Sequence, residues 1–155
     1  MFYLSVLTLA VFLALAAAAF IISGYGFLSK EQKGKVLLKD REFNVEIARS
    51  TMARNRGLSG RESLGEKEGM LFLFSGAGFH SFWMKDMRIP IDIIWIKDDR
   101  VAGFEINAQP EPGVRTAKLK RYLPPEPVDR VLEVPAGTVE RLDIQVGDEV
   151  KVSYN

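Results

Sequence analysis

The sequence predicts a mainly β fold, a compact β-sandwich or barrel of about eight short strands with one or two short helices, preceded by a single transmembrane helix. The charge distribution divides the chain, because residues 1–29 contain no charged side chain and every Asp, Glu, Lys and Arg lies in residues 30–155. Apolar and polar residues beyond the charge boundary mostly alternate with a period of two, which is typical of half-buried strands. We therefore expect an anchor at 1–29, a linker at 30–35 and a soluble β domain at 36–155.

The anchor is predicted from an almost wholly apolar run at residues 2–22, with Tyr3 and Tyr25 near its two ends. A helix over this run is about 30 Å long, which matches the hydrocarbon core of a bilayer. Tyrosine favours the membrane interfaces. We therefore expect a signal-anchor that crosses the membrane once and contacts it through residues 2–25. Small residues recur on one face of this helix and fit a weak seam for self-association: Ala10, Ala14 and Ala18.

A cleaved signal peptide is the alternative for the N-terminus, with Ala17 and Ala19 forming an A-x-A cleavage site. The anchor is favoured because the apolar run is longer than the hydrophobic region of such a peptide and no Lys or Arg precedes it. The five basic and two acidic residues in 30–41 favour a cytoplasmic domain under the positive-inside rule.

The strands of the domain are predicted from the same patterning. Residues 36–39 and 42–48 are expected to pair as a hairpin around Asp40-Arg41, because both alternate and a polar pair separates them. The remaining half-buried strands are expected at 101–107 and 149–154, and strands buried on both faces at 69–74, 79–84 and 91–96. Turns are expected at 75–78, at 86–90 and at Asp98-Asp99.

Two short helices and one long loop complete the predicted domain. The first helix begins at Ser50 or Thr51, either of which can cap it, and ends at Gly57. The second helix is "TVERL", capped by Thr138 after a Pro-Ala-Gly sequence. Five prolines between residues 108 and 127 predict a long loop there.

Several classes of chemistry lack the residues that they need. The chain has no cysteine, which excludes disulfides, thiol chemistry and lipidation of a cysteine. His80 is its single histidine, no G-x-S-x-G elbow is present, and no glycine-rich phosphate-binding motif occurs. A net charge of +1 gives no support for nucleic-acid binding. We therefore expect no metal, no cofactor and no nucleic-acid partner, and a structural role for His80.

Candidate ligand-binding residues lie in "FWMKDMRIPIDIIWI", residues 82–96, which is rich in both aromatic and charged side chains: Trp83, Lys85, Asp86 and Asp92. Asp92 shares strand parity with Ile94 and Ile96, so its carboxylate faces the core and needs a partner. Lys85 is the expected partner, in a structural ion pair. Asp86 stands where a turn begins, and an aspartate there usually bonds the local backbone.

A catalytic reading of the same stretch is the alternative. Asp86 and Asp92 flank the corner at Pro90, and two carboxylates brought together can hydrolyse a glycosidic bond. Trp83 and Trp95 can form a stacking platform for sugar, although tryptophans in apolar strands more often belong to the core.

Three motifs, "RNRGLSGRESLGEKEGMLFLF", "FWMKDMRIPIDIIWI" and "VLEVPAGTVERLDIQVGDEV", resemble in this order the family called domain of unknown function 192, over roughly residues 36–154. The sequence departs from the family pattern at Ser59, where many relatives carry methionine. The resemblance implies a compact, mainly β domain that is often exported behind a signal or anchor, and it brings no established activity. Export in relatives shifts the expected location of the domain to the extracytoplasmic side, since long domains translocate despite nearby basic residues.

The function expected from these observations is a non-enzymatic, membrane-tethered module that binds a ligand or partner at the cell envelope. An envelope hydrolase that acts on glycan through Asp86 and Asp92 is the alternative. A third hypothesis, an accessory subunit of a larger membrane complex, depends on the alanine face of the anchor.

Overall fold

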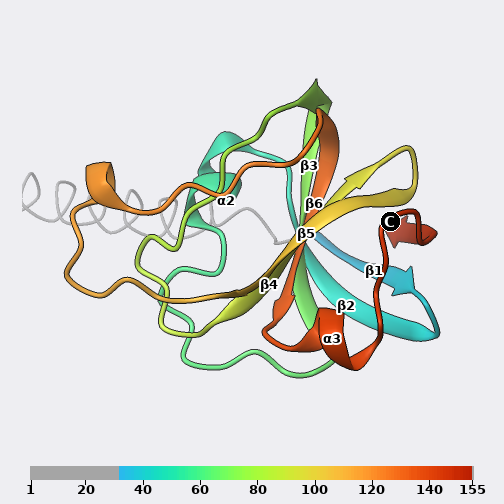
Figure 1. The fold of residues 1–155 in the computed structure, drawn as a ribbon, viewed down its shortest axis with the longest axis horizontal. Coiled ribbons are helices and arrows are strands. Elements are labelled where there is room, and N and C mark those ends of the chain that lie inside the picture. Colours follow the sequence, from blue (N-terminus) through green and yellow to red (C-terminus); the bar gives the residue numbers. More distant parts are fainter. Residues whose placement is uncertain (1–31, 155) are drawn as a thin grey trace, which may run out of the picture. The chain divides into compact units, whose positions relative to one another are not determined.

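A computed structural model describes residues 32–154, which form one seven-stranded sheet with the strand order β5-β4-β6-β3-β2-β1-β7 (Figure 1). The strands are β1 (Gln32–Leu38), β2 (Arg41–Ala48), β3 (Glu68–Gly78), β4 (Ile91–Lys97), β5 (Arg100–Ala108), β6 (Val128–Pro135) and β7 (Val150–Tyr154). Neighbouring strands are antiparallel except β2 and β3, which run parallel. The mainly β prediction is therefore confirmed.

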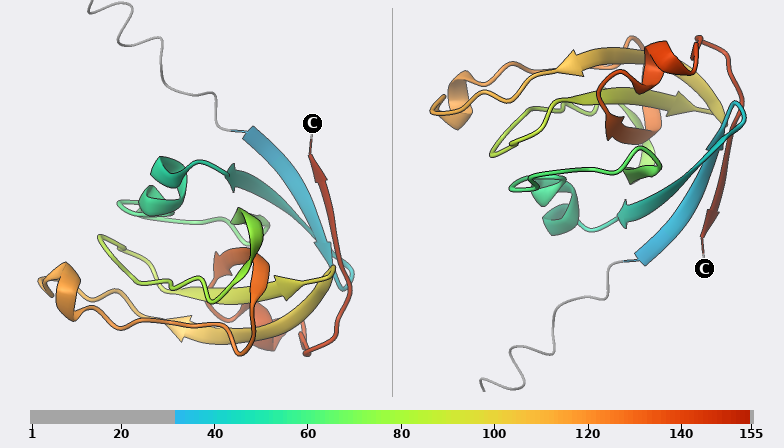
Figure 2. Two further views of the ribbon diagram at one scale, coloured as in Figure 1. Left: turned by 90° about the horizontal axis from the view of Figure 1, so that it is seen from above. Right: turned by 90° about the horizontal axis from the view of Figure 1, so that it is seen from below.

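The expected sandwich or closed barrel is not what these strands form. They belong to a single sheet, whose edge strands β5 and β7 form no ladder with each other and are linked by an isolated bridge between Arg100 and Glu149, the residue before β7. The sheet is instead strongly curled, so that β1, β2 and β7 lie across from β4 and β5 (Figure 2). Strong twist and curl let one sheet enclose a core without full closure.

The local predictions are largely confirmed. β1 and β2 form the expected hairpin, and Lys39 adopts a positive φ of 53° in its turn. Helix α2 (Thr51–Arg56) begins after Ser50, whose side chain accepts a hydrogen bond from the Ala53 N–H, and ends at Gly57. The strand β1 starts earlier than expected, so that residues 32–35 of the predicted linker are strand, because β2 pairs with all four and β7 pairs with Gly34 and Lys35.

Three local predictions are wrong. The turn expected at 75–78 does not form, because β3 continues to Gly78. Residues 79–84 are not a strand, since within the described residues this segment makes only one bridge, between Phe82 and Tyr122. Its apolar side chains are buried because the segment packs on a sheet face, which needs no ladder. Helix α3 (Thr138–Arg141) forms, but Gly137 is its N-cap, and the Thr138 hydroxyl donates to the Pro135 carbonyl at 2.6 Å.

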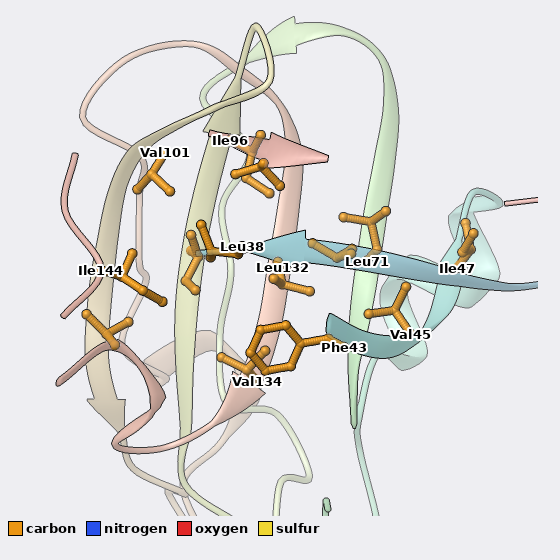
Figure 3. Close-up of a cluster of buried hydrophobic side chains, with 14 residues drawn as sticks. Leu38, Phe43, Val45, Ile47, Leu71, Ile96, Val101, Leu132, Val134 and Ile144 are labelled. Carbon is orange, nitrogen blue, oxygen red and sulfur yellow. The ribbon is translucent and has the colours of Figure 1, made fainter. Parts of the chain in front are cut away.

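The two faces of the sheet bury separate cores. The inner face of the curl carries one cluster, which includes Phe43, Leu71, Ile96 and Leu132 (Figure 3). Helix α3 adds Val139 to this cluster. The outer face carries a second cluster, on which α2, the 79–90 segment and the 109–127 loop with its 3₁₀ turn η1 (Thr116–Lys118) pack. Figure 2 shows these covering segments gathered at one end of the sheet.

The predicted anchor at 1–29 lies outside the described residues, as do its tyrosines, the Ala17–Ala19 cleavage site and the Ala10, Ala14 and Ala18 seam. Within residues 32–154, no helix has the length and apolar character that crossing a bilayer requires.

Candidate functional site

The predicted ion pair between Lys85 and Asp92 is wrong. Asp92 is completely buried on the inner sheet face, as its parity with Ile94 predicted, but its partners are backbone N–H groups. Its Oδ1 accepts hydrogen bonds from Asn107 (2.8 Å) and Gly137 (3.3 Å), and its Oδ2 accepts one from Val139 (2.8 Å). Carboxylates satisfied in this way are held firmly, because charge-assisted hydrogen bonds are stronger than neutral ones.

The three bonds give Asp92 a structural role. They tie β4 to the end of β5 and to the start of α3, where the first helical N–H groups need an acceptor. Positive φ angles at Asn107 (53°) and Gly137 (81°) accompany this arrangement. Lys85 instead lies 3.5 Å from the Asp86 carboxylate, at the surface.

The carboxylate pair of the hydrolase hypothesis does not form a catalytic site. Asp92 has no exposed surface and uses both oxygens on backbone donors, whereas the Asp86 side chain is 71% exposed. A general acid or base must reach the substrate, which Asp92 cannot do from this position.

A pocket of about 160 Å³ lies on the outer sheet face, beneath α2 and the 79–87 segment. Trp83 and Lys85, two of the four predicted site residues, line it, whereas Asp86 and Asp92 do not. The structure therefore divides the predicted set: one half belongs to a cavity, and the other half consists of one surface residue and one buried structural residue.

Aromatic side chains form the walls of the pocket. Phe72 and Phe82 meet edge to face with centroids 4.9 Å apart, and Phe74 stacks on His80 at 3.5 Å. The His80 ring nitrogen Nε2 lies 3.2 Å from the Gly76 carbonyl oxygen, so the histidine has local partners, as expected for a structural residue. Trp83 belongs to this wall, and the Arg121 guanidinium covers its ring at 4.1 Å.

Glu133 supplies the acidic group of the pocket. It lies in β6 between Met70 of β3 and Ile93 of β4, is 5% exposed, and lines the cavity. Among the described residues its Oε2 has no hydrogen-bond partner, and burial raises the pKa of the carboxyl to about 8 from 4.5. A buried carboxyl of this kind is mostly protonated at neutral pH, because the charged form loses its hydration.

Backbone packing fixes Glu133 in this position. A side chain at Gly69 of β3 would place its Cβ 2.6 Å from the Glu133 carbonyl oxygen, so glycine is needed for β3 and β6 to approach this closely. Sequence reasoning missed Glu133. The signal was present in "VLEVP", where a single acidic residue interrupts an apolar run that forms a central strand.

Basic side chains occupy the solvent side of the pocket. Arg54 donates hydrogen bonds to the carbonyl oxygens of Arg49 (2.5 Å) and Leu73 (3.0 Å), which do not neutralise its charge. Arg56 is exposed, and the Lys85 side chain is 42% exposed. The lining is therefore polarised, with a carboxyl group inside and cationic groups outside.

A larger, more open hollow of about 750 Å³ lies over β1, β2 and β7. Its charged lining residues include two ion pairs, Arg61 with Glu46 and Arg130 with Asp99. In residues 32–154, the buried side-chain polar atoms without a partner are Glu133 Oε2 and Trp95 Nε1, and neither residue lines this hollow. The pocket at Glu133 is the better candidate because it contains a polar group that a ligand would satisfy.

Metal binding has no structural support in the described part of the chain. Within residues 32–154, no three His, Asp or Glu side chains gather as ligands for an ion.

Comparison with known proteins gives a family and a fold. The model of the family DUF192, described as Uncharacterized ACR, matches residues 34–152. A protein of unknown function from Novosphingobium aromaticivorans is similar in structure, with a TM-score of 0.69 and 32% identity over 81% of this chain and 89% of that one. A protein from Sinorhizobium meliloti, provisionally described as a transcription regulator, has a TM-score of 0.68 and 28% identity over 79% and 93%. No curated protein matches the chain.

Proposed function

Because the chain belongs to the DUF192 family, whose description carries no activity, we propose its function from the pocket: it is a membrane-tethered, non-enzymatic module that binds a small ligand at the cell envelope. The observation that carries the proposal is the carboxyl of Glu133, which lines a cavity with aromatic walls and whose buried Oε2 has no partner among the described residues. Aromatic walls that surround a buried polar group are typical of small-molecule sites, and here charged side chains of Arg54, Arg56 and Lys85 also line the cavity.

The pocket is small, which restricts its ligand. Its volume of about 160 Å³ is below the 300–1,000 Å³ that is usual for drug-sized molecules, so we expect a ligand of a few non-hydrogen atoms. The hydrolase alternative is not proposed, since Asp92 is sealed from solvent. The regulator description of the Sinorhizobium meliloti protein is not transferred, because this chain balances 21 basic with 20 acidic residues.

We propose that residues 2–25 lie in the bilayer and that the domain lies on its extracytoplasmic side. A tether of this kind would keep the binding module at the cell envelope.

Blocking the mouth of the pocket is expected to abolish ligand binding. Ser81 is exposed and lines the cavity, so Ser81→Trp fills its mouth without disturbing the core. Ser75→Trp is the matched control, at an exposed position of β3 outside the pocket lining. The measurement is ligand-observed NMR of the full chain in detergent micelles against a mixture of small amines, acids, alcohols, sugars and aromatic molecules.

We expect at least one class to bind the parent and Ser75→Trp but not Ser81→Trp. A chain that binds none of them, or a Ser81→Trp variant that still binds, contradicts the proposed binding function.

Tethering is tested separately. We expect the chain to stay in the membrane fraction after washing at alkaline pH, because about twenty apolar residues inserted as a helix are not extracted by loss of surface contacts. Release into the supernatant would contradict the anchor. A reporter fused after residue 155 that is active only outside the cytoplasm would support the proposed orientation, and one active only inside would contradict it.

A further inference from the structure

The polarity of the pocket contains information about the ligand. The carboxyl of Glu133 lies at the buried end, and the side chains of Arg54, Arg56 and Lys85 lie on the solvent side of the same cavity. A ligand that complements both ends must carry a hydrogen-bond-donating or positive group inside and a negative group outside.

The inner end favours an ammonium group. Glu133 Oε2 has no partner in residues 32–154, and the walls of the pocket include the rings of Phe72, Phe82 and Trp83. An ammonium group satisfies the carboxylate with a charge-assisted hydrogen bond, and aromatic faces stabilise the same cation. A primary alkylamine is a stronger base than this carboxyl, whose pKa burial raises to about 8, so the ligand arrives as an ammonium ion and Glu133 releases its own proton to solvent when the ion binds.

The outer end favours an anion in the same molecule. Arg54 is bonded to two carbonyl oxygens, which carry no net charge, and the ion-pair partner of Lys85 within residues 32–154 is Asp86 at 3.5 Å. A simple cation would meet these like charges at the entrance. A zwitterion whose anion remains at the mouth removes this repulsion.

We propose that the pocket binds a small zwitterion, with its primary ammonium group on Glu133 and its carboxylate or phosphate toward Arg54, Arg56 and Lys85. This inference rests on the proposed ligand-binding function and names the ligand class of the same site. Two kinds of molecule carry an ammonium group and an anion this close together: a short free amino acid, and the aminoethyl phosphate headgroup of a membrane lipid.

Affinity for such a ligand depends on pH in a defined way. Below about pH 8 the carboxyl must release its proton when the ammonium binds, so affinity rises about tenfold per pH unit up to that point and is level above it. The titratable or charged groups that face Glu133 are Arg54 and Arg56 of α2, His80 after β3, and Lys85 of the 79–90 segment. The variant His80→Asn separates a contribution of the histidine from that of Glu133.

The test is isothermal titration calorimetry of the full chain in detergent micelles at several pH values between 6 and 9. The probes are 4-aminobutanoate and 2-aminoethyl phosphate, with butanoate, which lacks the amine, and butylamine, which lacks the anion, as controls. We expect the zwitterions to bind at least tenfold more tightly than either control and to show the rise with pH. Glu133→Gln is expected to remove the pH dependence and to weaken zwitterion binding at least tenfold, whereas Glu66→Gln, at an exposed turn, leaves both unchanged.

Vesicles distinguish the two sources. If the purified chain binds phosphatidylethanolamine but not phosphatidylcholine, and Glu133→Gln removes this binding, the ligand is a lipid headgroup. If the chain binds the free zwitterions alone, the ligand is a soluble molecule.

Equal binding of butanoate and 4-aminobutanoate, or unchanged binding in Glu133→Gln, overturns the inference. If Ser81→Trp blocks another class of molecule while the zwitterions fail to bind the parent, the proposed binding function stands and this inference alone fails.

Discussion

Replacing Glu133 by glutamine is expected to abolish a large fall in the stability of the protein as pH rises. The unfolded carboxyl loses its proton near pH 4.5, whereas the buried one keeps it to about pH 8. Between these values the folded state binds one proton more than the unfolded state, so each pH unit lowers the free energy of unfolding. The contribution of Glu133 to the free energy of unfolding is fully present below pH 4.5 and is lost by about pH 8. The total loss is about 5 kcal/mol.

The measurement is denaturant unfolding of the full chain in micelles at intervals between pH 4 and pH 9. The Glu133→Gln profile should lack this fall, and the comparison isolates Glu133 because the neighbouring Arg54, Arg56, His80 and Lys85 are present in both proteins. Glu66→Gln should retain the fall, since that side chain is exposed. Parallel profiles for the parent and Glu133→Gln would show that Glu133 ionises normally in the folded protein.

Asp92→Asn is expected to destabilise the protein by about 2–4 kcal/mol, because its amide NH₂ must face backbone donors that now bond a carboxylate. Those donors are the N–H groups of Asn107, Gly137 and Val139. The matched variant Asp86→Asn should change stability by no more than about 0.5 kcal/mol, since its side chain is exposed and asparagine tolerates the positive φ of 54° there.

Lys85→Met belongs to the same experiment and should also be nearly neutral, because Lys85 does not pair with Asp92. The readout is the midpoint of denaturant unfolding at pH 7. Equal midpoints for Asp92→Asn and Asp86→Asn would contradict the structural role of Asp92.

Local chemistry explains which parts of the fold were predictable from sequence. The hairpin of β1 and β2, the Ser50 cap of α2, the turn at Asp98-Asp99 and the proline-rich loop each depend on residues next to one another. Residues 79–84 have the composition of a buried strand, but strand formation also needs a partner ladder. β3 pairs with both β2 and β6 along residues 70–72, and the segment after Gly78 finds only the single bridge of Phe82 with Tyr122 in the described residues.

The candidate site was predictable only in part, for a similar reason. Strand parity placed Asp92 on the core face correctly, but the backbone donors of Asn107, Gly137 and Val139 come from elements that the pattern does not bring near it. Trp83 and Lys85 were found because they are conspicuous in sequence. Glu133 was missed because its burial depends on the segments that cover the outer sheet face, and a single acidic residue in a strand normally faces water.

The central claim is that Glu133 is an unpaired, buried carboxyl that a ligand satisfies. Its most direct test is a ¹³C NMR titration of the side-chain carboxyl carbon in the glutamate-labelled full chain, with Glu133→Gln supplying the assignment. The carboxyl of Glu133 is expected to titrate with a midpoint near pH 8 in the free protein and to be ionised already at pH 6 when 4-aminobutanoate saturates the pocket. A midpoint close to the ordinary value of 4.5 in the free protein would contradict the claim.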